Sequence, residues 1–201
     1  MNIQENISLL PFNTFGIDKN ARFFATATST EDVKQLIQKS KEMNVPLFIL
    51  GGGSNILLTK NLEALVMKME IKGFELIEED ENGVLVKVGA GESWHEFVLY
   101  CIQKNWGGVE NLSLIPGTVG ASPMQNIGAY GVEVKELITE LSALEIRSGI
   151  VVNFTNESCR FDYRDSIFKQ ALKDQYVITS VTFRLRKTAQ LNLSYPALRD
   201  A

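Results

Sequence analysis

The chain has 201 residues, of which 45% are hydrophobic, and a formal net charge of −4. This much apolar material can build one large domain or two small lobes. Lysines and arginines are scattered among acidic residues, which excludes the basic footprint of a nucleic-acid-binding protein and a polybasic membrane patch. No apolar run approaches the roughly 18 residues needed to span a bilayer, and the first residues lack a basic start followed by an apolar stretch. We therefore expect a cytoplasmic globular protein without nucleic-acid or membrane partners.

The first part of the chain is predicted to combine short strands with one helix. Residues 9–24 are rich in aromatic side chains and form an irregular segment that leads into a short strand. Residues 28–32 supply an N-cap and first-turn acids for a helix that ends near Asn44, just before Pro46. Further strands are expected at residues 47–50, 56–58 and 62–69, with a glycine turn at 51–55.

The second part of the chain carries the signals of antiparallel structure. Residues 74–79 and 84–89 alternate with period two around Asn82-Gly83, the strongest hairpin signal in the sequence. Ser93 and Glu96 fit a capping box that opens a helix through about residue 104. A second hairpin is expected from strands at residues 141–147 and 150–154, and a final strand at residues 176–186. These elements predict an α+β fold whose second lobe is mainly an antiparallel sheet with flanking helices.

A long loop at residues 110–131 is the most unusual stretch of the chain. After Glu110 it contains no Asp, Glu, Lys or Arg, although four glycines and two of the five prolines lie in it. A solvated linker normally carries charge, and a core helix or strand does not tolerate so many breakers. We infer buried backbone whose N–H groups face a ligand, one with phosphates.

A second glycine-rich turn, Gly-Gly-Gly-Ser-Asn at residues 51–55, follows a predicted strand. It is not a dinucleotide fingerprint, because Ile56 stands where the last glycine is required, and it is not a P-loop. Alone it indicates a tight turn between strands. Together with residues 110–131 it could line a pyrophosphate, with side-chain hydrogen bonds from Ser54, Asn55, Ser122 and Asn126. This pattern suggests a nucleotide cofactor held without a Rossmann fold.

The cysteines and the histidine offer little for catalysis. Cys101 and Cys159 lie far apart in apolar or helical settings, and we expect two reduced structural thiols. The single histidine, His95, lies in a helical pattern beside Trp94. With one histidine and no clustered cysteines we expect no metal site. A nucleophilic relay would have to use His95, for which we expect a structural role.

Residues 159–169 contain a candidate catalytic arginine. Arg164 is flanked by Tyr163 and Asp165, in a stretch too mixed to be a simple helix face. An ordinary surface ion pair with an aspartate is one interpretation. The other is a guanidinium directed at negative charge that develops during a reaction.

Five motifs, in this order, resemble the UDP-N-acetylenolpyruvoylglucosamine reductase family of bacterial peptidoglycan synthesis. Each glycine turn alone is weakly specific, whereas the set is highly specific and covers essentially the whole chain. The motifs are Pro-Phe-Asn-Thr-Phe-Gly at 11–16, the glycine turn 51–55, Gly-Ala-Gly-Glu-Ser-Trp at 89–94, the whole of 110–131, and Tyr-Arg-Asp-Ser-Ile-Phe-Lys at 163–169.

The resemblance implies a two-lobed FAD-binding domain of the vanillyl-alcohol-oxidase type. Residues 1–68 would form the first lobe, residues 69–190 the second, and residues 191–201 the start of a connection to a substrate domain. It further implies an oxidoreductase of cell wall biogenesis, with roles in cell shape and the cell cycle. NADPH reduces the bound FAD, and a UDP-linked amino sugar carrying an enolpyruvyl group is then reduced to UDP-N-acetylmuramate. We expect a monomer.

The resemblance also implies roles for individual residues. Arg164 would stabilise the negative charge that develops on the enolpyruvyl carboxylate, and Tyr163, Arg164 and Tyr195 would contact the substrate. The expected FAD-binding residues are Gly51, Gly52, Gly53, Ser54, Asn55, Ile115, Pro116, Gly117, Thr118, Gly120, Ala121, Ser122, Asn126, Gly128, Ala129, Tyr130 and Ile178.

The carboxy-terminal residues suggest a fragment of a longer protein. The pattern at residues 193–201 predicts the start of a helix with Pro196 in its first turn, and the sequence stops at Ala201 before one amphipathic repeat. Family members carry a proton donor and a carboxylate in the domain that follows, and neither position is present here. We expect the FAD-binding part of the reductase, inactive or weakly active by itself.

Two other functions are compatible with the residues. A related flavin-dependent alcohol or sugar oxidase would typically link its flavin covalently through a histidine or cysteine, for which His95 and Cys101 are the nearby candidates. A nucleotide-binding module without a redox role would bind ADP-ribose compounds but not FAD.

Overall fold

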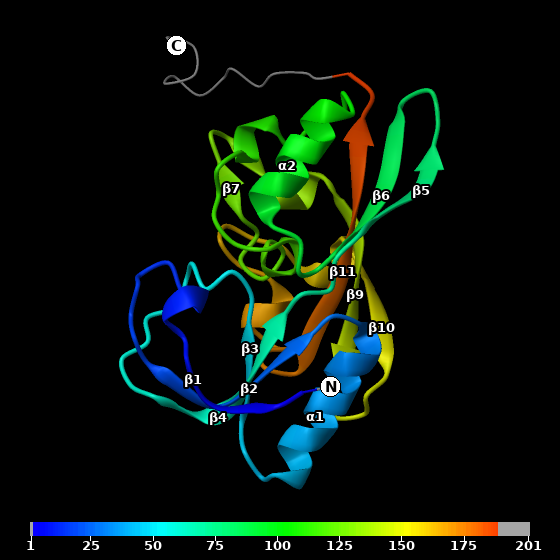
Figure 1. The fold of residues 1–201 in the computed structure, drawn as a ribbon. Coiled ribbons are helices and arrows are strands. Elements are labelled where there is room, and N and C mark those ends of the chain that lie inside the picture. Colours follow the sequence, from blue (N-terminus) through cyan, green and yellow to red (C-terminus); the bar gives the residue numbers. More distant parts are fainter. Residues whose placement is uncertain (1, 189–201) are drawn as a thin grey trace.

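The computed structural model describes residues 2–188, which form two large β-sheets with one helix beside each, and a small two-stranded sheet (Figure 1). The first sheet and helix α1 (Thr30–Glu42) lie in the lower half of the view. The upper half holds helix α2 (Trp94–Gln103) and part of the second sheet, whose longest strand runs through both halves. Both helices were predicted from their caps and apolar spacing.

The first sheet has the strand order β1-β2-β4-β3. Its strands are β1 (Gln4–Ser8), β2 (Asn20–Ala27), β3 (Leu47–Leu50) and β4 (Leu62–Met69). β4 pairs in parallel with both β2 and β3, whereas β1 pairs antiparallel with β2. Helix α1 connects β2 to β3, and its buried side chains Val33, Leu36 and Ile37 pack against this sheet. Ser29 and Asp32 form a complete capping box at its start.

The second sheet is antiparallel throughout, with the order β10-β9-β11-β6-β5. Its strands are β5 (Phe74–Glu79), β6 (Gly83–Gly89), β9 (Ile138–Glu145), β10 (Val151–Thr155) and β11 (Tyr176–Arg186). Helix α2 packs on the sheet through Trp94 and Phe97, whose rings meet Phe183 of β11. At the start of α2, Ser93 Oγ accepts a hydrogen bond from Glu96 N at 3.5 Å, which is half of the expected capping box. The predicted α+β class with an antiparallel second sheet is confirmed.

Short elements fill the connection between α2 and β9. They are the 3₁₀ turns η2 (Glu110–Leu112), η3 (Val119–Ala121) and η4 (Val134–Glu136), and the small strand pair β7 (Gly128–Ala129) and β8 (Val132–Glu133). Further 3₁₀ turns are η1 (Leu10–Phe12), η5 (Glu157–Cys159) and η6 (Ile167–Lys169).

A shared core joins the two sheets. Leu144 of β9 and Val177 of β11 belong to the same buried cluster as Leu36 of α1 and Met67 of β4. This packing holds the end of β3 close to the loop that contains η3, so the glycine turn after β3 and the uncharged loop meet between the sheets.

The structure differs from the predicted elements at three places in the first sheet. No strand forms at residues 56–58, because Leu58 is buried as an irregular segment in the core beneath the first sheet, without pairing to a strand. β1 was not predicted, since it is an edge strand of mostly exposed residues without an alternating pattern. Met69, the first residue of the expected second lobe, closes β4 of the first sheet. The expected lobe boundaries otherwise remain predictions, and residues 191–201 lie outside the described part.

Candidate functional site

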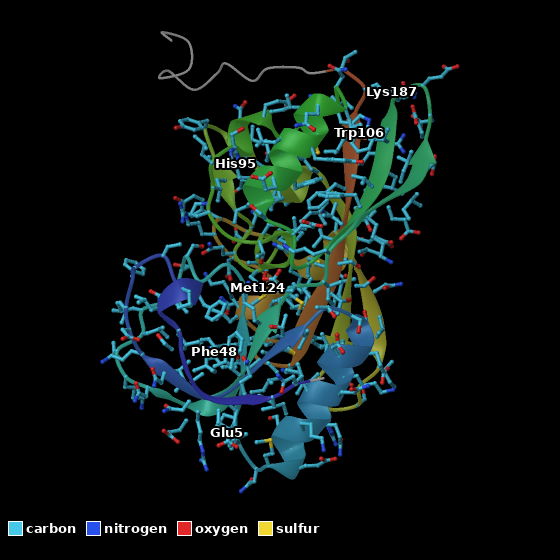
Figure 2. The ribbon with its side chains drawn as sticks, viewed as in Figure 1. Glu5, Phe48, His95, Trp106, Met124 and Lys187 are labelled. Atoms are coloured by element: carbon cyan, nitrogen blue, oxygen red, sulfur yellow. The ribbon has the colours of Figure 1, made fainter. Side chains whose placement is uncertain are left out.

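Two adjoining cavities lie where the glycine turn and the uncharged loop meet. One, of about 320 Å³, is lined by residues 51–55 together with Pro116, Gly117 and Thr118. The other, of about 330 Å³, is largely apolar and lies between Phe48 of β3, Ala90 and Ile178 of β11. The cavities share the lining residues Ile49, Gly51, Thr118, Ala121 and Met124. Figure 2 shows Met124 at the junction of the two halves of the molecule and Phe48 in the lower half.

Glycine is required where the two loops touch. A Cβ atom added to Gly52 would lie 2.8 Å from Cα of Gly117, closer than real Cβ contacts allow. Gly117 itself has a φ of 124°, which favours glycine. The absence of a side chain at Gly52 therefore allows the two loops to approach each other, and glycine at 117 allows the backbone conformation found there. This contact supports the pairing of the two segments that the sequence suggested.

The loops leave a set of backbone donors without a protein acceptor. Among the described residues, no N–H group of residues 51–55, and neither that of Gly117 nor that of Thr118, donates a hydrogen bond to another residue. All of these residues except the exposed Asn55 are buried or half-buried, and unbonded N–H groups in such positions favour an acceptor that is not part of the protein. Consecutive backbone N–H groups suit an anion such as a pyrophosphate, and the apolar cavity beside them suits a flat ring. The residues present therefore fit a dinucleotide such as FAD.

The structure gathers many, though not all, of the predicted cofactor-binding residues. Those that line at least one cavity are Gly51, Gly52, Gly53, Ser54, Asn55, Pro116, Gly117, Thr118, Gly120, Ala121, Ser122 and Ile178. Those that line neither are Ile115, Asn126, Gly128, Ala129 and Tyr130. Their roles as ligand contacts remain predictions.

The side chains of Ser122 and Asn126 are buried and bonded to the protein rather than directed to a ligand. Ser122 Oγ donates to Val119 O at 2.8 Å. Asn126 Nδ2 donates to Asp162 O at 2.9 Å, and its Oδ1 accepts from Lys135 N at 3.1 Å. Asn126 thus anchors the turn that carries Arg164.

Arg164 and Tyr163 occupy the tip of a two-residue turn. Asp162 and Asp165 close the turn with mutual backbone hydrogen bonds of 3.1 Å. Arg164 adopts a left-handed φ of 50°, which is uncommon for a residue other than glycine. Its side chain is exposed and, among the described residues, forms no ion pair with an aspartate or glutamate. The guanidinium is therefore available to an external anion, whereas the surface ion pair with Asp165 is absent.

Several residues that line the cavities were not predicted from the sequence. Trp94, Met124, Gln125 and Lys169 line the cavity beside the glycine turn. Gln125 is linked to Asn55, another lining residue, whose Nδ2 donates to Gln125 Oε1 at 3.2 Å. The only sequence signal for these residues was their position inside the quoted motifs. Tyr195, a predicted substrate contact, lies outside the described residues.

Neither cysteine has the features of a reactive thiol. Both are buried and form no disulfide. Burial raises the pKa of the Cys159 thiol to about 12, and burial together with the nearby Glu110 carboxylate raises the pKa of Cys101 well above its usual range. His95 lines neither cavity, and its Nδ1 accepts a hydrogen bond from Leu114 N at 3.2 Å. These positions agree with structural roles for all three residues.

Within residues 2–188, no helix is both long and apolar enough to cross a bilayer, and no group of three or more metal-ligating side chains is present.

The fold and the donor-lined cavities define a flavin-binding domain. Residues 21–155 match the family of FAD-binding domains, so the chain belongs to that family. The chain is also similar to solved structures of this class. A vanillyl-alcohol-oxidase-type flavoprotein from Myceliophthora thermophila gives a TM-score of 0.63 at 13% identity, over 83% of this chain and 32% of that one. This likeness confirms the predicted fold.

Within the class, the chain is similar to UDP-N-acetylenolpyruvoylglucosamine reductases, as its motifs suggested. It is 50% identical to the one from Amoebophilus asiaticus over 200 residues, covering 100% of this chain and 59% of the relative. It is also 50% identical to the one from Flavobacterium johnsoniae, over 97% of this chain and 58% of the relative. The crystal structure of the Thermus caldophilus reductase gives a TM-score of 0.75 at 22% identity, over 94% of this chain and 64% of that one. The chain thus spans about three fifths of the length of these curated relatives.

Proposed function

We propose that this chain is the FAD-binding part of an NADPH-dependent reductase that converts UDP-N-acetylglucosamine enolpyruvate to UDP-N-acetylmuramate. The reaction belongs to cytoplasmic synthesis of peptidoglycan precursors. The observation that carries the proposal is the pair of uncharged glycine loops, whose residues line a shared cavity and among whose N–H groups those of residues 51–55, Gly117 and Thr118 donate no hydrogen bond within the described part of the chain. Identity of about 50% along the whole chain to reductases of this name supports the choice of reaction.

The residues of this chain would hold the cofactor as follows. Backbone N–H groups of residues 51–55, Gly117 and Thr118 would donate to the pyrophosphate. The apolar cavity lined by Phe48, Ala90 and Ile178 would shield the remainder of the FAD molecule from water. When bound, FAD supplies the ability to accept a hydride from a nicotinamide and pass it to carbon. We assign residues 1–68 and 69–190 to the two lobes of the FAD-binding domain, although Met69 closes β4 of the first sheet, and residues 191–201 to the start of a connection to a substrate domain.

The substrate side of the site is assigned to the turn at residues 162–165. Arg164 places a fixed positive charge where the enolpyruvyl carboxylate gains negative charge, which lowers the energy of that state without rearrangement. Tyr163, which is 79% exposed, lies beside it at the tip of the turn. Tyr163 and Tyr195 contact the UDP-linked sugar in this proposal.

A spectroscopic experiment tests the proposal. The purified chain is incubated with FAD, freed of excess cofactor and titrated with NADPH without oxygen, with NADH as the comparison. We expect a flavin band that bleaches with NADPH. A protein that retains no flavin refutes the proposal. Flavin that stays attached after denaturation, together with oxygen consumption on an alcohol donor, would assign the chain to the oxidases instead.

A further inference from the structure

We propose that Lys169 is the cation that binds the phosphate groups held by the glycine loops, and that it links this site to the turn of Arg164. This inference rests on the proposed function, because it assumes a dinucleotide in the cavity. Lys169 is the one charged side chain among the described residues that line the cavity beside the glycine turn. A pyrophosphate brings about two negative charges, which neutral N–H donors alone would leave uncompensated.

The backbone of Lys169 is held firmly beside the cavity. Lys169 is the last residue of η6, whose N-cap Ser166 is 1% exposed. Ser166 Oγ donates to the carbonyl oxygen of Met124 at 2.7 Å, and Met124 lines both cavities. The neighbouring Phe168 is buried in the core of the second sheet. Lys169 itself is exposed, but the position of its backbone relative to the cavity is set by these buried neighbours.

The ammonium group of Lys169 has N–H donors that the described residues do not use. Its Nζ donates to the backbone carbonyl oxygen of Arg164 at 2.8 Å. No carboxylate among the described residues forms an ion pair with Lys169. A lysine ammonium has three N–H donors, so the bond to Arg164 leaves two for phosphate oxygens. One side chain can thus contact the cofactor and support the left-handed backbone of Arg164 at the same time.

A purely structural role of Lys169 and a direct contact with phosphate predict different effects of its substitution on ligand affinity. If Lys169 only supports the Arg164 turn, its loss should affect all ligands of the cavity equally or none of them. If it binds phosphate, its loss should weaken ligands that carry a pyrophosphate and spare those that lack one. The phosphate contact should also weaken as salt concentration rises.

The test compares Lys169→Gln and Lys169→Arg with a matched control, Lys173→Gln, in the full chain. Lys173 is an exposed lysine nearby that lines neither cavity. Binding of FAD is followed by flavin fluorescence, and ADP and riboflavin are used as displacing ligands. We expect Lys169→Gln to weaken FAD and ADP about 10-fold and to leave riboflavin unchanged. Lys169→Arg should restore most of the affinity, and Lys173→Gln should match the wild type.

Two results would overturn the inference while leaving the proposed function intact. One is a wild-type protein that binds FAD and a Lys169→Gln variant that binds it equally well at low salt. The other is equal weakening of FAD and riboflavin, which would mean a structural role only. Failure of the wild-type protein to bind FAD would instead refute the proposed function.

Discussion

At the scale of single residues, the site depends on missing side chains as much as on present ones. Gly52 and Gly117 let two loops touch, and a Cβ at Gly117 would also lie 3.3 Å from Ser54 Oγ. The loop glycines could be recognised from the sequence because charge-free, breaker-rich segments are rare. The sequence could not show which glycines face each other, because that depends on how the two sheets pack.

Substitution of Gly117 by valine should weaken FAD binding strongly. A β-branched side chain at a φ of 124° strains the backbone and fills the space where the cofactor phosphates would approach. Flavin retained after gel filtration measures the effect. Gly149→Val, at a φ of 72° in a distant hairpin, controls for backbone strain and should keep its flavin. Equal flavin content in Gly117→Val and wild type would refute this placement.

Substitution of Arg164 by alanine should leave FAD affinity unchanged, because Arg164 lines neither cavity. Any turnover with the UDP-linked enolpyruvyl sugar should fall about 100- to 1,000-fold, since a fixed donor to developing charge is lost. Arg160→Ala is a close control, since Arg160 is also exposed and has a φ of 46°. Loss of flavin from Arg164→Ala alone would indicate a structural role for Arg164.

At the scale of elements, the sequence predicted those helices and strands whose positions are set by interactions between residues close in sequence. The hairpin around Asn82-Gly83, both helices and β11 follow from caps, turn residues and periodicity. The pattern failed at residues 56–58, where an apolar segment finds core contacts without a strand partner. It also could not reveal that Asn126 bonds to Asp162, since these residues are 36 positions apart.

Substitution of Asn126 by alanine should destabilise the fold by about 1–3 kcal/mol. The change removes buried hydrogen bonds to Asp162 O and Lys135 N and leaves those groups without their partner. Urea unfolding measures the free energy of unfolding. Asn153→Ala, which removes only an exposed bond from Ser142 Oγ, should change it by less than about 0.5 kcal/mol. Equal effects of the two substitutions would contradict the anchoring role of Asn126.

The contact between the β5–β6 turn and β11 should make stability depend on acid pH. A hydrogen bond from Arg184, with further bonds from the N–H groups of Asn82 and Gly83, holds the pKa of Asp80 below its usual value. A lowered folded-state pKa stabilises the fold above the unfolded value of about 3.9, and this stabilisation is lost as pH falls through the folded value.

Arg184→Met removes the largest cause of the lowered pKa of Asp80. The free energy of unfolding of this variant should therefore fall less steeply than that of the wild type between about pH 5 and about pH 3. Chemical denaturation at a series of pH values measures the difference. Arg186→Met, two positions along the same strand, should follow the wild-type curve. Parallel curves for Arg184→Met and wild type would show that this contact does not contribute.

At the scale of the whole molecule, the cavity arises from the packing of one sheet against the other. Residues 51–55 follow β3 of the first sheet and line one side of the cavity. Gly117 and Thr118, which directly precede η3, also line it. The sequence was sufficient to pair these loops, whereas the pyrophosphate between them remains a prediction. The place of Lys169 in the cavity could not be predicted, because it depends on a contact of η6 with Met124, which is distant in sequence.

The central claim is that the two loops together hold FAD, and an equilibrium titration of the wild-type chain with FAD tests it most directly. Flavin fluorescence and the visible spectrum should report saturable binding of one FAD per chain, and ADP should compete for the same site. A chain that stays colourless and leaves flavin fluorescence unchanged at every FAD concentration would contradict it.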